Sequence, residues 1–274
     1  MIAAATSLVC SQKAADAADA SAWNSGAHSA VRLIAGRPLK ASGAPVLRAG
    51  IELKMDTGWK TYWRHPGDSG VPPRFEFGGS RNVKDIQVSW PAPVRFADGG
   101  GMSVGYTTQV VLPLRVIPLD PLTPVTVRLK LGYAVCEKLC VPEDAELELT
   151  LDTTEPSHEA ALRASEARVP KRAAIGADGP LAIMAVSRAP GPKPRVTVDV
   201  VSRRDADEID LFAEGPSADW SLPLPEPVAG AASGIRRFAF ELDGLPPGAE
   251  PQGATLTLTA VAGAEAIEVA YHLD

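Results

Sequence analysis

The chain has 274 residues and a formal net charge of −6 at pH 7. This length allows two domains of ordinary size, each with its own buried core. The acidic balance argues against nucleic acid or an anionic membrane surface as a partner. No run approaches the roughly 18 consecutive apolar residues that indicate a membrane-spanning helix.

The composition favours a protein built of β-strands. Its 24 glycines and 25 prolines are spread along the chain between short runs rich in valine, leucine and threonine, and aromatic residues make up 5%. Short alternating runs separated by turn-forming residues are typical of antiparallel sandwiches. The sequence therefore predicts an all-β protein of two immunoglobulin-like β-sandwich domains joined by a short helical connector.

Residues 1–27 are rich in alanine, serine and aspartate and show no periodic pattern, so we interpret them as a leader and tail. Residues 1–10 are apolar but lack a basic start, which indicates a truncated or atypical export signal, and residues 15–20 offer small-residue cleavage sites. Cys10 follows a poor lipidation motif, and we assign it to the leader.

The first predicted domain covers residues 28–153. Its expected strands share short apolar–polar alternation, and they are residues 30–35, 45–54, 59–63, 74–77, 85–90, 107–117, 125–135 and 145–151. Residues 66–73 are expected to form a rigid loop of turn formers. Residues 96–106 contain several glycines and are predicted to form a surface loop, without the Lys-Ser/Thr ending of a phosphate-binding loop.

A change of period predicts a helix over residues 155–168, with Ser157 as its N-cap, inside a linker that spans residues 154–176. Alternation then resumes and predicts a second, smaller sandwich over residues 177–274. Its expected strands are residues 181–186, 195–201, 209–212, 236–242, 255–261 and 266–273. This domain has no cysteine and no cluster of catalytic side chains.

Cys136 and Cys140 follow the most strand-like run of the chain. In a continuous strand their Cα atoms would lie about 13 Å apart, at roughly 3.3 Å per residue. A disulfide requires about 7 Å or less, so the backbone must turn back between them if they pair. The resulting ring is small and contributes about 2 kcal/mol of loop entropy. Such a ring suits redox exchange better than stabilisation.

Three other interpretations of the cysteine pair remain open at this stage. The pair can be a structural disulfide, half of a metal site, or two buried free thiols. A zinc site lacks a second ligand pair, because the four histidines are scattered: His28, His65, His158 and His272. Glu137 and Lys138 make a poor setting for buried thiols. A variant of the binding hypothesis places Cu(I) on Cys136, Cys140 and Met102, although we expect no metal and no cofactor.

The cysteine stretch resembles the N-terminal periplasmic domain of the DsbD family of thiol:disulfide interchange proteins, and most of all its ScsB-like branch. The segments that carry the resemblance keep their order and spacing over roughly residues 30–150. They are residues 58–63, residues 66–73, residues 90–93 followed by Arg95-Phe96, residues 105–106, residues 133–136 and residues 140–142.

The resemblance implies an immunoglobulin-like sandwich with a redox-active cysteine pair. By position, Cys140 forms mixed disulfides, Cys136 is its partner, and Tyr62 lies beside them. Lys138 is adjacent in sequence, and its charge would favour a thiolate, whereas the charge of Glu137 would oppose one, so the sequence leaves the sign of the effect open. A cap that shields the pair from small thiols is expected from Phe96, Asp98, Gly99, Gly100, Gly101, Met102 and Tyr106.

The resemblance also implies partners and a compartment. A thioredoxin-like or membrane-embedded thiol reductase would donate electrons, and periplasmic disulfide proteins would accept them, in roles such as cytochrome c biogenesis and copper tolerance. The given sequence has neither membrane segments nor a thioredoxin-type Cys-x-x-C, so we expect a separate reductase. The cysteine spacing is shorter than in the best-known member, and the cap is richer in glycine. The rival hypothesis is a non-enzymatic periplasmic binding module with a structural disulfide.

Overall fold

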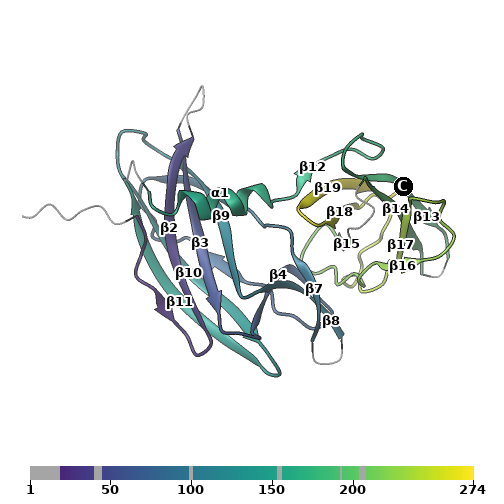
Figure 1. Cartoon of the computed structure of the whole chain (residues 1–274), viewed down its shortest axis with the longest axis horizontal. Helices are drawn as coiled ribbons and strands as arrows, with labels where there is room; N and C mark the ends of the chain where they lie inside the picture. The colour runs from purple at the N-terminus through teal and green to yellow at the C-terminus, as the bar shows by residue number, and fades with distance from the viewer. Residues whose placement is uncertain (1–18, 40–44, 99–100, 153–155, 192, 204–207) are drawn as a thin grey trace, which may run out of the picture.

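The structure is a computed structural model, and it describes residues 19–39, 45–98, 101–152, 156–191, 193–203 and 208–274. These residues form two β-sandwich domains, with one helix lying across the first (Figure 1). The predicted all-β architecture of two sandwiches is confirmed. Among the described helices, none has the length and apolar character needed to cross a membrane.

The first domain consists of two antiparallel sheets. In order across the first sheet the strands are β1 (Asn24–Ser25), β2 (Ser29–Leu39), β3 (Val46–Met55), β9 (Gln109–Pro118) and β6 (Val83–Val88). Across the second they are β11 (Cys140–Leu151), β10 (Val125–Cys136), β4 (Lys60–Gly67), β8 (Gly101–Thr107) and β7 (Val94–Asp98), while β5 (Arg74–Glu76) pairs with β10.

Strand alternation builds the core between these sheets. Along β10, Val125, Val127, Leu129, Leu131 and Tyr133 occupy every second position and are all buried. Successive side chains of a strand point to opposite faces, so this pattern turns one face of β10 toward the first sheet. Because β10 ends at Cys136, the packed core fixes the position of the first cysteine.

The helix α1 (Glu159–Ala167) covers the outer face of the first sheet. Leu162 is fully buried against Ile34 and Val111. Gly36 leaves the space for it, since a Cβ atom at that position would lie 2.3 Å from a methyl group of Leu162. The helix is therefore part of the first domain's packing as well as a connection to the second domain.

The helix start differs from the prediction. Residues 155–168 were expected to be helical with Ser157 as N-cap, but α1 begins at Glu159, and His158 takes the N-cap position without a side-chain hydrogen bond. Instead, the backbone N–H and hydroxyl of Ser157 both donate to the Asp19 carboxylate. An N-cap serine would accept a hydrogen bond from a helix N–H, but Ser157 is held as a donor by a carboxylate far away in sequence, which a local capping rule does not include.

The first domain also begins earlier than predicted. Residues 24–25 pair with β2, and the ring of Trp23 lies under the charged groups of Arg32 and Lys54, at 4.3 and 4.9 Å. Residues 19–27 therefore belong to the first sheet, and a boundary at residue 28 is too late. Residues 1–18, with Cys10, lie outside the described part of the chain.

The second domain has two four-stranded sheets within the described residues. One contains β12 (Lys171–Arg172), β19 (Glu265–His272), β18 (Thr255–Ala262) and β15 (Ile209–Glu214). The other contains β13 (Leu181–Ala189), β14 (Arg195–Ser202), β17 (Arg236–Glu241) and β16 (Glu226–Val228). All six strands predicted here are present. The two that were missed, β12 and β16, have only two and three residues.

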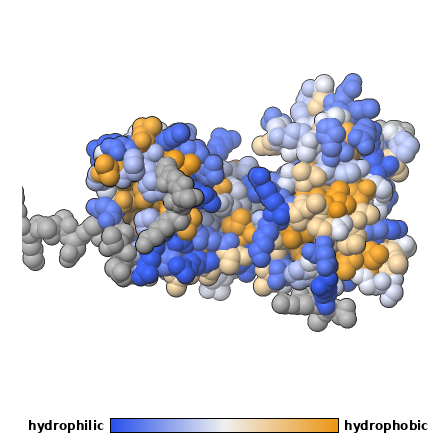
Figure 2. Space-filling model, turned by 90° about the horizontal axis from the view of Figure 1, so that it is seen from above, coloured by the Kyte–Doolittle hydropathy of each residue, from blue (hydrophilic) through white to orange (hydrophobic). Residues whose placement is uncertain are grey.

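The two domains share part of a hydrophobic core. Phe212 and Leu224 of the second domain belong to the cluster of buried residues of the first, and the Phe212 ring lies 5.7 Å from that of Trp63. Figure 2 shows the two domains as two lobes that are in contact with each other. The contact lies at β4, β7 and β8, the strands on the side of the first sandwich that faces the second domain (Figure 1).

Candidate functional site at the Cys136–Cys140 disulfide

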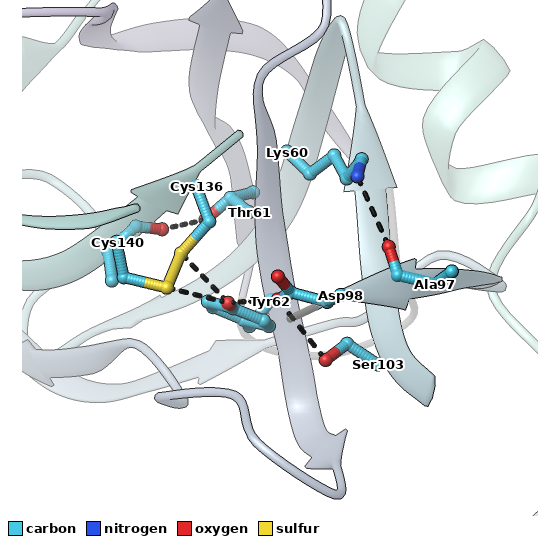
Figure 3. Close-up of a disulfide and its surroundings, with 9 residues drawn as sticks. Lys60, Thr61, Tyr62, Ala97, Asp98, Ser103, Cys136 and Cys140 are labelled. Atoms are coloured by element: carbon cyan, nitrogen blue, oxygen red, sulfur yellow. Dashed lines mark hydrogen bonds between the residues drawn. A yellow bond between two sulfur atoms is a disulfide. The ribbon is translucent and has the colours of Figure 1, made fainter. Parts of the chain in front are cut away.

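The two cysteines close the hairpin between β10 and β11. They face each other in the register of the two strands, with a Cα–Cα distance of 4.2 Å, and their sulfur atoms are bonded (Figure 3). Residues 137–139 form the turn between them. The chain therefore reverses between the cysteines, as pairing requires, and in this structure they form a disulfide and are not two free thiols.

The two sulfurs occupy unequal environments. Cys136 is only 1% exposed, because β10 is enclosed between β11 and β4 at this level and Cys136 pairs with Lys60. Cys140 is an exposed residue on β11, the edge strand of the sheet. Exchange depends on access to the attacked sulfur. An incoming thiolate can therefore reach Cys140 more readily than Cys136.

Tyr62 reaches the disulfide from β4. Its hydroxyl oxygen lies 2.8 Å from the Cys136 sulfur and 3.1 Å from the Cys140 sulfur, and it donates a 2.6 Å hydrogen bond to the Asp98 carboxylate. Burial raises the pKa of Tyr62 far above 10, and the bond to Asp98 raises it further. Tyr62 therefore keeps its proton at neutral pH, and its hydroxyl can donate a hydrogen bond to the Cys136 sulfur during exchange.

Asp98, at the end of β7, adds a negative charge to the site. Its carboxylate accepts the Tyr62 hydrogen bond and a 3.4 Å bond from the Ser103 hydroxyl on β8. A carboxylate oxygen and both sulfurs lie within 4.8 Å of one another. Like charges at this separation oppose each other, so the Asp98 carboxylate disfavours a thiolate on either sulfur.

Phe96 closes the apolar side of the site. It packs in a small cluster with Tyr62, Ala134 and Cys136, and the centre of its ring lies 6.4 Å from that of Tyr62. The ammonium of Lys60 lies 5.0 Å over the Phe96 ring and donates to the carbonyl of residue 97 at 3.4 Å. Two alternate residues of β7, Phe96 and Asp98, thus cover the sulfurs together with Tyr62.

The stretch predicted as a loop is mostly a hairpin. Residues 94–98 and 101–107 form paired strands, and Gly101 faces Asp98 across them. Gly99 and Gly100 lie outside the described residues. Strand alternation gives the residues of this hairpin two opposite faces, and Ser103, whose hydroxyl donates to the Asp98 carboxylate, was missed by the sequence prediction. The alternation of residues 101–107 was the signal that could have shown it.

The remaining predicted site residues lie apart from the sulfurs. Met102 packs against the main core, and Tyr106 is buried there with its hydroxyl donating to the carbonyl of Pro91 at 2.8 Å. Lys138 is exposed in the turn. Met102 packs against the main core, so the structure does not bring it together with the two cysteines as the Cu(I) hypothesis expects.

Replacing Asp98 by asparagine is expected to speed alkylation of reduced Cys140 at neutral pH by about tenfold, because it removes a charge that opposes the thiolate. Iodoacetamide rates measured across a range of pH would show this. Ser103→Ala is the control, since it alters a neighbour of the same carboxylate and keeps the charge. Equal rates for Asp98→Asn and the unmodified protein would contradict an electrostatic role for Asp98.

Comparisons with known proteins agree with this geometry. Residues 37–152 match the family model described as thiol:disulfide interchange protein DsbD, N-terminal. The crystal structure of the N-terminal periplasmic domain of ScsB from Proteus mirabilis is similar over 93% of this chain and 98% of that chain, with a TM-score of 0.70 and 21% sequence identity. No curated protein gives a significant sequence match.

The two comparisons cover different parts of the chain. The family match lies within the first domain and contains Tyr62, Asp98 and both cysteines of the site. The structural likeness extends over both domains and, at this identity, concerns the fold alone. Residues 37–152 of this chain are therefore an N-terminal domain of the DsbD family of thiol:disulfide interchange proteins.

Proposed function

We propose that the chain carries electrons from a thiol reductase to disulfide proteins of the periplasm, through reversible opening of the Cys136–Cys140 disulfide. The family supports thiol–disulfide exchange in general, and the similar ScsB domain is periplasmic by its description. The observation that carries the proposal is the unequal burial of the bonded sulfurs, with Cys140 exposed and Cys136 enclosed.

The first half-reaction reduces the pair. A donor thiolate attacks the Cys140 sulfur, the Cys140–Cys136 bond breaks, and Cys136 leaves with the electron pair. Tyr62 is placed to donate a hydrogen bond to the departing Cys136 sulfur. The donor's second thiolate then attacks the donor sulfur that is bonded to Cys140, and Cys140 is released. The donor becomes a disulfide, and the pair gains two electrons and two protons.

The second half-reaction returns those electrons to an acceptor. Cys140, as a thiolate, attacks the acceptor disulfide and forms a mixed disulfide, and Cys136 then attacks Cys140 and re-forms the internal bond. The acceptor leaves with two thiols. The donor is proposed to be a thioredoxin-like or membrane-embedded reductase, as the family resemblance implies. Its sulfur would approach Cys140 on the exposed edge strand β11.

Trapping tests the proposal. A Cys136→Ser variant expressed in its native compartment keeps the accessible Cys140 but loses the sulfur that resolves the mixed disulfide. Mixed disulfides sensitive to dithiothreitol are expected to accumulate with this variant, and mass spectrometry of the trapped species would identify donor and acceptor. Cys140→Ser is the matched control and is expected to trap little. Equal trapping by both variants, or none by either, would contradict the assigned roles.

A further inference from the structure

One arginine joins the redox site to the second domain. Arg95 lies on β7 next to Phe96, and its side chain is 12% exposed. Its guanidinium contacts four groups of the second domain: the Glu226 carboxylate at 2.9 Å, the carbonyl oxygens of Pro225 at 2.9 Å and Leu211 at 3.3 Å, and the Asp210 carboxylate at 3.5 Å.

Strand geometry gives β7 two functional faces. Phe96 and Asp98 point to the disulfide, where they contact Tyr62. Arg95 precedes Phe96, so its side chain leaves the strand on the opposite face, and there it binds the second domain. The strand that covers the disulfide with one face is thus bound to the second domain through its other face.

The strand β4, which β8 separates from β7 in the same sheet, is held in a similar way. Arg64 lies two residues after Tyr62, stacks over Trp63 at 4.5 Å, and binds Glu214 and Glu268 of the second domain, both at 2.7 Å. Both strands that bring side chains to the sulfurs are therefore tied to the second domain by partly buried arginines. Such a pair is costly to break, because the remaining charge is left unpaired in a partly dry interface.

We infer that the second domain positions the redox site. In particular, the ion pairs of Arg95 with Asp210 and Glu226, called here the Arg95 anchor, hold β7 so that Phe96 and Asp98 stay over the disulfide and restrict attack by small thiols. Arg95 is a positioning residue, since it acts through Phe96 and Asp98 and touches neither sulfur in the described structure. The inference rests on the proposed function, because it assumes that the disulfide is opened by thiols.

The test changes only the second domain's side of the anchor. The variant Asp210→Asn/Glu226→Gln keeps every residue of the first domain and the shape of both side chains, but removes both charges that face Arg95. Glutathione is the probe. One glutathione thiolate attacks Cys140, a second resolves the mixed disulfide, and the products are the reduced pair and oxidised glutathione. The rate is followed by alkylation of the thiols formed.

The anchor variant is expected to react with glutathione at least about threefold faster than the unmodified protein, which corresponds to about 0.65 kcal/mol in the barrier. Asp199→Asn is the matched control, because it breaks the Asp199–Arg237 ion pair, which lies wholly inside the second domain. Its rate is expected to stay within the threefold limit. A folded anchor variant that reacts with glutathione less than threefold faster than the unmodified protein would overturn the inference. So would an Asp199→Asn control that is accelerated as much as the anchor variant.

Two further variants keep the test decisive. If Asp210→Asn/Glu226→Gln fails to fold, Glu226→Gln alone is used under the same threefold criterion, since the Glu226 side chain is 64% exposed. Glu226→Asp retains the charge and is expected to react with glutathione at the unmodified rate, which a merely steric role of this residue would not predict. Failure of the proposed function is seen separately, as an unmodified protein whose disulfide glutathione and dithiothreitol both leave intact.

Discussion

Replacing Cys140 by serine is expected to abolish both steps of exchange, whereas Cys136→Ser is expected to abolish turnover and leave a single attack intact. The reason is that Cys136 is 1% exposed and Cys140 is an exposed residue. A reduced Cys136→Ser protein mixed with 5,5′-dithiobis(2-nitrobenzoate) should release one equivalent of thionitrobenzoate rapidly. Reduced Cys140→Ser should react about 100-fold more slowly, because access limits the attack.

Two controls define this result. The reduced unmodified protein should release two equivalents, the second from the attack of Cys136 on the mixed disulfide. The variant Cys136→Ser/Cys140→Ser should release no thionitrobenzoate from the site. Any thionitrobenzoate that it does release measures the contribution of Cys10 where that residue is present. If both single variants reacted at the same rate, Cys136 would be as accessible as Cys140, and the direction of attack proposed above would be wrong.

Replacing Arg48 by alanine is expected to lower the free energy of unfolding by about 3–5 kcal/mol, because it removes a buried guanidinium and with it two ion pairs between β3 and α1. Arg48 is 3% exposed and binds Glu159 and Glu166 of α1, each with a 2.8 Å hydrogen bond. Urea denaturation would measure the loss. Arg163→Ala is the control, since the exposed pair of Arg163 with Glu159 should contribute within about 1 kcal/mol.

The same ion pair predicts how stability depends on pH. Burial alone would raise the pKa of Glu159, but hydrogen bonds from Arg48, the Arg37 backbone and Arg163 outweigh it and lower the pKa to about 2, from 4.5. A lowered folded-state pKa stabilises the protein fully above pH 4.5, and this contribution is lost as the pH falls toward 2. Arg48→Ala should therefore lose less stability over this interval than the unmodified protein. Parallel curves would contradict the assigned coupling.

Much of the fold was predictable because its signals are local. Alternation along a run such as residues 125–135 depends only on strand geometry and burial. The turn between Cys136 and Cys140 followed from the distance that a disulfide can span. The family resemblance brought Tyr62 and Asp98 into the candidate site. In the structure the Tyr62 hydroxyl lies within hydrogen-bonding distance of both the Cys136 sulfur and the Asp98 carboxylate.

Glycine content misled the prediction for residues 96–106. Gly105 was read as a sign of a loop, yet it lies in β8 opposite Tyr62, where a Cβ atom would come within 1.9 Å of the Thr61 carbonyl oxygen. Glycine is there because two strands approach closely, a use that sequence pattern does not separate from flexibility. Met102 and Tyr106 were assigned to the cap because residues 96–106 correspond by position to the cap of the family.

The contacts between distant segments were beyond sequence reasoning. Ser157 bonds Asp19 across 138 residues, and Arg95 bonds Glu226 across 131 residues. Neither arrangement has a local pattern, because each partner looks like an ordinary polar or charged surface residue in its own segment. The role inferred for the second domain therefore depends on the three-dimensional structure.

The reduction potential of the Cys136–Cys140 pair tests the central claim most directly. The protein would be equilibrated in buffers of defined glutathione and dithiothreitol composition, and its reduced fraction measured by the mass added on alkylation. An exchanging pair is expected to have a potential above about −300 mV, within reach of thiol partners. A value below about −300 mV would show a structural disulfide and would contradict the proposed function.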